Sequence, residues 1–107
     1  MSVFDDRKNS NERKFVLEAQ QLFKAEARRN KYIAAWAGDL FGLSEEELKK
    51  YTLAVIASDM EEAGDDDVFR KVKADFEEHG VEMSPTSLRE KMDQLMNKAS
   101  EEVFNEG

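Results

Sequence analysis

The residues whose type and spacing could bind a ligand are three cations, Arg28, Arg29 and Lys31, which fall within about one helical turn. Guanidinium and ammonium groups gathered in this way can hold a phosphate or an acidic protein surface. Trp36 follows close behind and offers a ring on which a base could stack. The set therefore suggests weak binding of ATP or ADP. The alternative is that the cations pair with acidic side chains elsewhere in the same fold, and we favour this second interpretation.

A metal site or a catalytic site has little support in the sequence. The run Asp65, Asp66 and Asp67 suggests a Ca²⁺ loop, but Arg70 stands at the sixth position, where an EF-hand needs glycine. The aspartates are better explained as the N-cap and first turn of a helix, where carboxylates interact favourably with the helix dipole. His79 is the only histidine and the chain has no cysteine, which leaves a zinc site without its usual ligands. We expect no metal site, no required cofactor and no enzymatic activity.

Composition limits the fold that positions these residues. The 107 residues are 40% hydrophobic and 37% charged, with a formal net charge of -8. This length predicts one domain that can bury a core without disulfides. The mean hydropathy of -0.73 argues against a membrane-spanning segment. The sequence pI near 4.7 argues against nucleic acid as a partner, because phosphates would be repelled.

Helix start and stop signals predict four helices. Asn9 and Glu12 have the spacing of a capping box, and Gly42 is a natural residue to end the helix after Phe41. The first helix is thus expected from about Asn9 to Phe41. The other three are expected to begin at Ser44, at the aspartates 65–67 and at Ser84, and to end at Gly64, at His79 with Gly80, and near the C-terminus.

The first predicted helix has an interrupted apolar stripe. Leu22 and Phe23 lie before a polar gap, and Ile33 is the next large apolar residue of the stripe. No continuous apolar seam should therefore hold the front of this helix to the rest. The charge also changes along the chain, because residues 1–31 carry 8 Lys/Arg and 5 Asp/Glu (net +3) while residues 32–107 carry 8 and 19 (net -11). We predict an all-α fold, a compact four-helix bundle of residues 19–107 with a weakly anchored N-terminal arm of residues 1–18.

Several short segments, spread over nearly the whole chain, resemble one protein family. They are Phe4-Asp5-Asp6-Arg7, Ala27-Arg28-Arg29-Asn30-Lys31, Trp36-Ala37, Gly42-Leu43, Gly64-Asp65-Asp66-Asp67-Val68-Phe69-Arg70-Lys71-Val72 and Lys91-Met92-Asp93. In this order they resemble the zeta subunit family, the small α-proteobacterial inhibitors of the F-type ATP synthase. The segment from Gly64 to Val72 is the most specific, because no simple helix rule requires it.

The resemblance implies a four-helix body with a mobile N-terminal segment that enters a catalytic α/β interface of the soluble ATPase head and folds there as a helix. The head then cannot turn in the hydrolysis direction. The implied partners are the α and β subunits, with γ as a further contact, at the cytoplasmic face of the inner membrane and without insertion into it. The matching arm residues are Phe4 and Phe15 as apolar anchors, with Asp5, Asp6, Arg7, Lys8, Glu12, Arg13 and Lys14 between them.

A rival interpretation comes from the cations alone. It is a small binding domain that responds to adenine nucleotides, with Arg28, Arg29 and Lys31 on the phosphates and Trp36 on the base. The two functions are compatible, because an inhibitor could also sense ATP or ADP.

Overall fold

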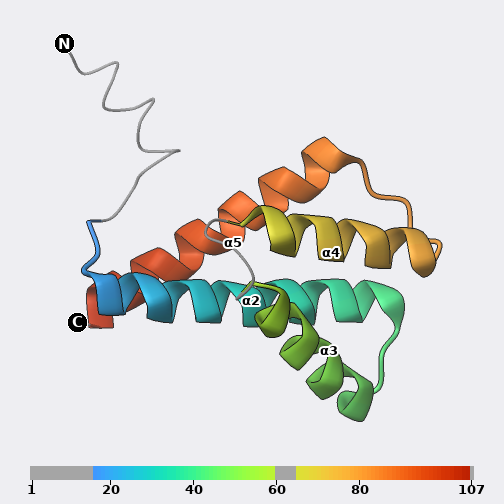
Figure 1. Ribbon diagram of the computed structural model, residues 1–107, viewed down its shortest axis with the longest axis horizontal. Coiled ribbons are helices and arrows are strands. Elements are labelled where there is room, and N and C mark those ends of the chain that lie inside the picture. The colour runs from blue at the N-terminus through green and yellow to red at the C-terminus, as the bar shows by residue number, and fades with distance from the viewer. Residues whose placement is uncertain (1–15, 60–64, 107) are drawn as a thin grey trace.

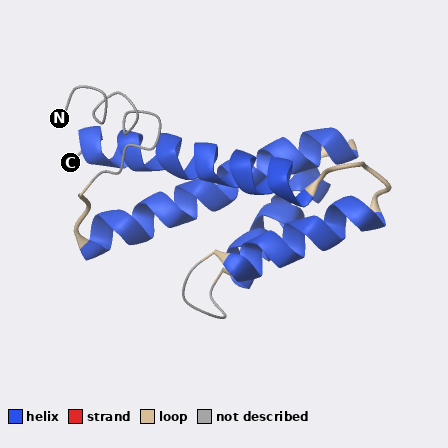
Figure 2. Ribbon diagram, turned by 90° about the horizontal axis from the view of Figure 1, so that it is seen from above, coloured by secondary structure: helices blue, strands red, loops and turns tan. Residues whose placement is uncertain are grey.

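Four helices account for most of the described chain. The computed structural model describes residues 16–59 and 65–106. The helices are α2 (Ala19–Phe41), α3 (Glu45–Ser58), α4 (Asp66–Glu78) and α5 (Pro85–Glu106). Figure 1 and Figure 2 show α2 and α5 running along the length of the molecule, with α3 and α4 beside the second half of α2. The described residues contain no strand, so the prediction of an all-α four-helix fold is confirmed.

The predicted helix caps explain most of the boundaries. The Ser44 hydroxyl accepts the Glu47 backbone N–H, and the Glu47 carboxylate accepts the Ser44 N–H at 2.9 Å, so this capping box is confirmed. Ser84 likewise accepts the backbone N–H of Ser87 at 3.0 Å. Gly42 ends α2 with φ +72°, a left-handed conformation that costs glycine little because it has no Cβ.

Two predicted boundaries differ from the structure. The first helix of the described residues, α2, begins at Ala19, because Glu18 is extended (φ -74°, ψ 164°) and its backbone N–H is taken by the Gln21 side chain at 3.0 Å. The capping box of Asn9 lies outside the described residues. The second helix ends at Ser58, with Asp59 as its C-cap, so it does not continue to Gly64, which is also outside the described residues.

The larger core cluster joins all four helices around Phe76, which is 2% exposed. The Phe76 ring packs against Trp36 and Phe41 of α2, with centroid distances of 5.4 and 4.9 Å. The buried members are Ile33, Ala34, Ala37, Val55, Val68, Val72, Phe76, Leu88 and Met92. Burial of these apolar side chains is the main stabilising contribution at this end of the molecule.

A second cluster, smaller and at the other end, holds the front of α2 to the end of α5. Ala25 of α2 packs with Ala99 and Val103 of α5, and all three are buried. We call this part, residues 19–32 of α2 with residues 95–106 of α5, the stem. The expectation that the front of this helix lacks firm attachment is wrong from Ala19 onward, because small apolar residues and ion pairs replace the missing large stripe. Of the predicted arm, only residues 16–18 are described, and Leu17 packs against this cluster.

Candidate functional site

Arg28 is held at the stem by two carboxylates of α5. Its guanidinium donates to both oxygens of Glu106, at 2.6 and 3.0 Å, and to Glu102 at 3.3 Å. The hydrogen bonds from Arg28 and Lys24 lower the pKa of Glu106 to about 2. The Tyr32 hydroxyl donates to Glu102, which lowers the pKa of Glu102 and raises that of Tyr32. Arg28 therefore has the intramolecular pairing that we favoured.

Arg29 points into the protein, where only 3% of it is exposed. Its Nε donates to the Asn30 side-chain oxygen at 3.0 Å, and its Nη2 lies 3.4 Å from Asp59 Oδ2. Asn30 in turn donates to the same oxygen of Asp59 at 2.9 Å. Beside them, burial and then the negative charge of Asp59 raise the pKa of Glu26. Arg29 is thus part of a buried polar network that links α2 to the C-terminal end of α3.

Lys31 and Trp36 have different surroundings. Lys31 is exposed, and no carboxylate among the described residues lies within ion-pair distance of it. Trp36 is half-buried against Phe76, with Lys91 Nζ 5.7 Å from its ring centroid. Arg28 faces α5, Arg29 faces the interior and Lys31 faces solvent, so these side chains do not converge with Trp36 on one open site.

The aspartates at the start of α4 hold neighbouring helices together. Arg89 of α5 pairs with Asp65 at 2.9 Å and with Asp66 at 3.2 Å, while Arg70 pairs with Asp67. Asp65 is the N-cap of α4, and Asp66 and Asp67 lie in its first turn, so the predicted placement is confirmed. The side chain of Asp65 makes no capping hydrogen bond, and its carboxylate binds Arg89 instead. Among the described residues, no group of three potential metal ligands comes together.

His79 is the C-cap of α4, as the sequence indicated. Its ring stacks on Phe41 with centroids 4.1 Å apart, and its Nδ1 lies 3.0 Å from the Asp75 carbonyl oxygen. This ring contact joins the end of α4 to α2.

The predicted arm residues, from Phe4 to Phe15, lie outside the described part of the chain. The structure instead reveals surface features that sequence reasoning missed. Leu22 and Phe23, expected on the buried stripe, are 42% and 69% exposed. The signal that could have found them is Ala25: a small residue at the helix contact tells which face of α2 meets α5, and Phe23 is two residues away, on the other side.

No helix of the described chain is both long and apolar enough to cross a membrane. A comparison with curated proteins returned no match. The family model for ATPase inhibitor subunit zeta, in contrast, matches residues 1–102. A match over nearly the whole chain shows that this protein belongs to the ATPase inhibitor subunit zeta family.

Proposed function

We propose that this chain blocks ATP hydrolysis by the F-type ATP synthase by inserting its N-terminal segment, residues 4–15, into a catalytic α/β interface of the soluble head. Membership of the ATPase inhibitor family carries the inhibitory part of this proposal. The insertion, the α, β and γ subunits as partners and the location at the cytoplasmic face of the inner membrane are what the sequence resemblance adds to it.

The packing of the described helices supports separate roles for the two parts of the chain, in which the helical body folds by itself and the N-terminal arm binds the partner. Both core clusters are closed by packing among residues 17–103. The chain enters the stem through three non-helical residues, and Val16, the first of them, is 90% exposed. A segment that precedes such an exposed residue can reach a partner without disrupting the helical core.

Insertion must overcome the entropy lost when a short segment folds on its partner. Two aromatic anchors, Phe4 and Phe15, can supply apolar burial for this purpose, and aromatic anchors commonly dominate the energy of an interface. The charged residues between them would then set the register of the segment against the partner.

The direct test is to add the purified full chain to its own soluble ATPase head and to measure ATP hydrolysis. We expect inhibition by the unchanged chain and weaker inhibition by Phe4→Ala and by Phe15→Ala. Leu53→Ala is the matched control, because Leu53 is an exposed apolar residue on α3, 67% accessible and far along the chain from the arm. Inhibition that is unaffected by both arm variants would contradict insertion.

The adenine-nucleotide alternative has less structural support, because carboxylates already bind Arg28 and Arg29. A titration with ATP, followed by residue-resolved chemical shifts, separates the two functions. Saturable shifts centred on Lys31 and Trp36 would favour the nucleotide-binding domain.

A further inference from the structure

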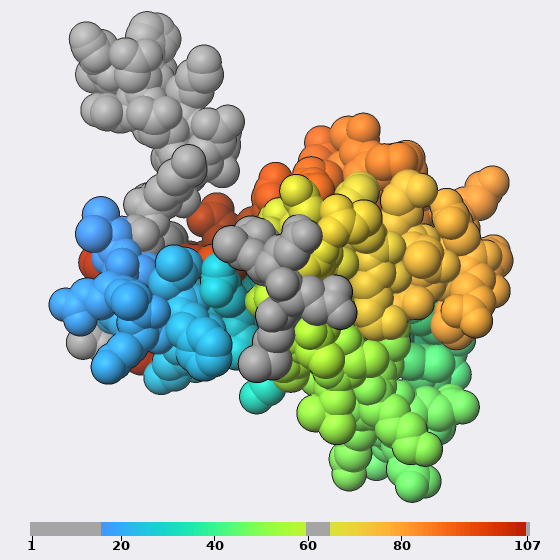
Figure 3. Space-filling model, viewed as in Figure 1, coloured from blue at the N-terminus to red at the C-terminus, as the bar shows by residue number. Residues whose placement is uncertain are grey.

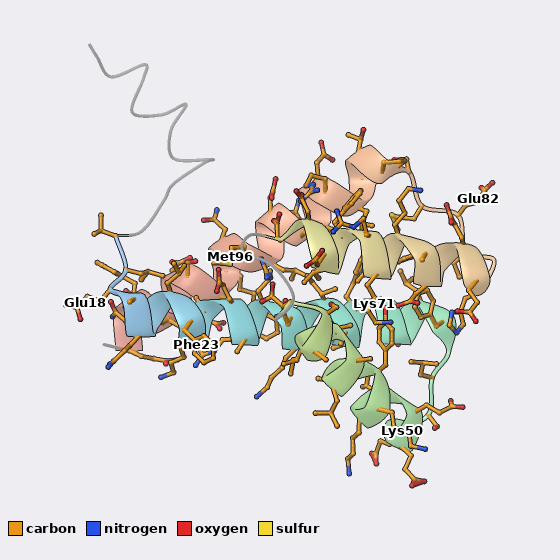
Figure 4. All side chains as sticks on the ribbon, viewed as in Figure 1. Glu18, Phe23, Lys50, Lys71, Glu82 and Met96 are labelled. Carbon is orange, nitrogen blue, oxygen red and sulfur yellow. The ribbon has the colours of Figure 1, made fainter. Side chains whose placement is uncertain are left out.

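The solvent side of the stem carries apolar surface that its own fold does not use. Phe23 is 69% exposed and Leu22 42% exposed on the first turns of α2. Neither takes part in the two core clusters of the described residues. Figure 4 shows Phe23 on the lower edge of α2, while Met96 of α5 lies above that helix.

The stem presents this surface on a well-supported helix. Ala25, two residues after Phe23, is buried against Ala99 and Val103 of α5. The ion pairs of Arg28 and Lys24 with Glu106 connect the same two helices. Phe23 is therefore held outward by the packing of the opposite face of α2. In Figure 3 the start of α2 forms one end of the molecule, and α3 protrudes at a distance from it.

A positive charge accompanies the apolar surface. Lys31 is exposed on α2 two turns beyond Phe23 and lacks a carboxylate partner among the described residues. Residues at spacings of four, such as Phe23, Ala27 and Lys31, follow one another along a helix surface. A partner that matches this face would offer an apolar depression with carboxylates beside it.

We propose that Leu22, Phe23 and Lys31, which we call the rim face, form a second contact with the ATPase head beside the opening that residues 4–15 enter. The proposal rests on the proposed function, and the length of the intervening chain supports it. Residues 16–18 span at most about 10 Å when extended, and five helical residues add about 7.5 Å. Phe23 therefore lies within about 18 Å of Phe15, so a protein surface that encloses Phe15 also comes close to the rim face.

The test compares full-length variants for their inhibition of ATP hydrolysis and for their direct binding to the soluble head. We expect Phe23→Ala to raise the concentration for half-inhibition about tenfold, as the loss of a buried interface aromatic does. Leu53→Ala is the control, since it removes a similarly exposed apolar residue from α3. Equal helicity and melting temperature of the two variants would show that both are folded.

A charge reversal tests the expected chemistry of the partner. Lys31→Glu should weaken binding several-fold at low salt, and the difference should shrink as salt screens the charges. Lys49→Glu is the control, because Lys49 is exposed on α3 and the change in net charge is identical. If Phe23→Ala and Lys31→Glu behave like their controls, the rim face is not a contact.

The arm variants separate this proposal from the proposed function. Loss of inhibition with Phe4→Ala and Phe15→Ala but not with Phe23→Ala would overturn the rim contact and leave insertion intact. Weaker binding with Phe23→Ala but not with the arm variants would support the rim contact and contradict insertion. Sedimentation of the free proteins tests a second copy of this chain as the partner. If Phe23→Ala has a lower mass in solution than the unchanged protein but inhibits equally well, the rim face contacts a second copy and the proposal is overturned.

Discussion

At the scale of single residues, the guanidinium of Arg29 is a buried charge, which costs free energy unless it is paired and hydrogen-bonded. Only 4% of its side chain is exposed, and its countercharge, Asp59, is itself 15% exposed. Burial removes hydration from both groups, so the pair is favourable only while every partner is present. Asn30 contributes by donating to the same Asp59 oxygen. Nη2 of Arg29 has the Asp59 charge nearby but makes no hydrogen bond. The network therefore has no additional hydrogen bond at this atom that could compensate for the loss of Asp59.

Removing Asp59 should therefore destabilise the protein strongly. We expect Asp59→Ala to lower the free energy of unfolding by about 3–5 kcal/mol, because it removes the carboxylate that forms the ion pair with the buried Arg29 cation. Urea denaturation followed by circular dichroism measures the change. The double variant Arg29→Met with Asp59→Ala is the control, and it should recover part of the loss. A single variant as stable as the unchanged protein would show that Arg29 is compensated in another way.

At the scale of helices, the stem contains carboxylates whose pKa values are shifted in opposite directions. Those of Glu102 and Glu106 are lowered, whereas that of Glu26, near Asp59, is raised, so the stability that they contribute changes with pH in opposite ways. The hydrogen bonds from Arg28 and Lys24 lower the pKa of Glu106 from 4.5 to about 2, and Tyr32 lowers that of Glu102. A lowered folded-state pKa gives stability that is present above pH 4.5 and is lost as the pH falls toward 2. Glu26 has a raised pKa, so its contribution is present below pH 4.5 and is lost as the pH rises through its folded-state pKa.

Acid should consequently loosen the stem between about pH 4.5 and pH 2. We expect the hydrogen-exchange protection factors, which correct for the intrinsic effect of pH on exchange, to fall at the start of α2 and the end of α5 in this window before they fall around Phe76. Glu106→Gln should weaken the dependence on pH, because a neutral amide no longer changes its charge. Glu101→Gln is the control, since Glu101 is exposed on the same helix. Protection factors that fall equally at both ends of the molecule would contradict this local effect.

The helices were predictable wherever the signal is local. Ser44 with Glu47, Gly42 and Ser84 marked helix ends correctly, because a cap depends on neighbours within a few residues. The start of α2 was missed, since Val16 and Leu17 continue the apolar pattern although residues 16–18 are not helical and Glu18 is extended.

Pairs distant in the sequence could not be predicted in the same way. Arg28 and Glu106 are 78 residues apart, and among many charged residues composition gives no reason to match these two. The exposure of Phe23 depends on the same missing information, namely which face of α2 meets α5. The candidate arm came from a resemblance over short motifs, and nothing in charge or periodicity would have named the ATPase.

At the scale of the whole molecule, body and arm should be separable. We expect deletion of residues 1–14 to leave the helical body folded and to abolish inhibition, because both described core clusters lie beyond the deleted segment. Circular dichroism and thermal melting test the fold, and ATP hydrolysis by the soluble head tests inhibition. A loss of helicity much larger than the deleted residues can account for would show instead that the arm is structural.

The sharpest consequence of insertion concerns the direction of rotation. A segment wedged into a catalytic interface must follow that interface as it changes shape, so rotation one way should trap the segment and rotation the other way should expel it. Binding free energy alone cannot favour one direction at equilibrium, and the asymmetry must come from the driven cycle. We therefore expect strong inhibition of ATP hydrolysis but little inhibition of ATP synthesis under a proton-motive force. Membrane vesicles assayed in both directions, with Phe4→Ala as the weakened control, test this. Equal inhibition of both directions would contradict a one-way wedge even if the subunit binds tightly.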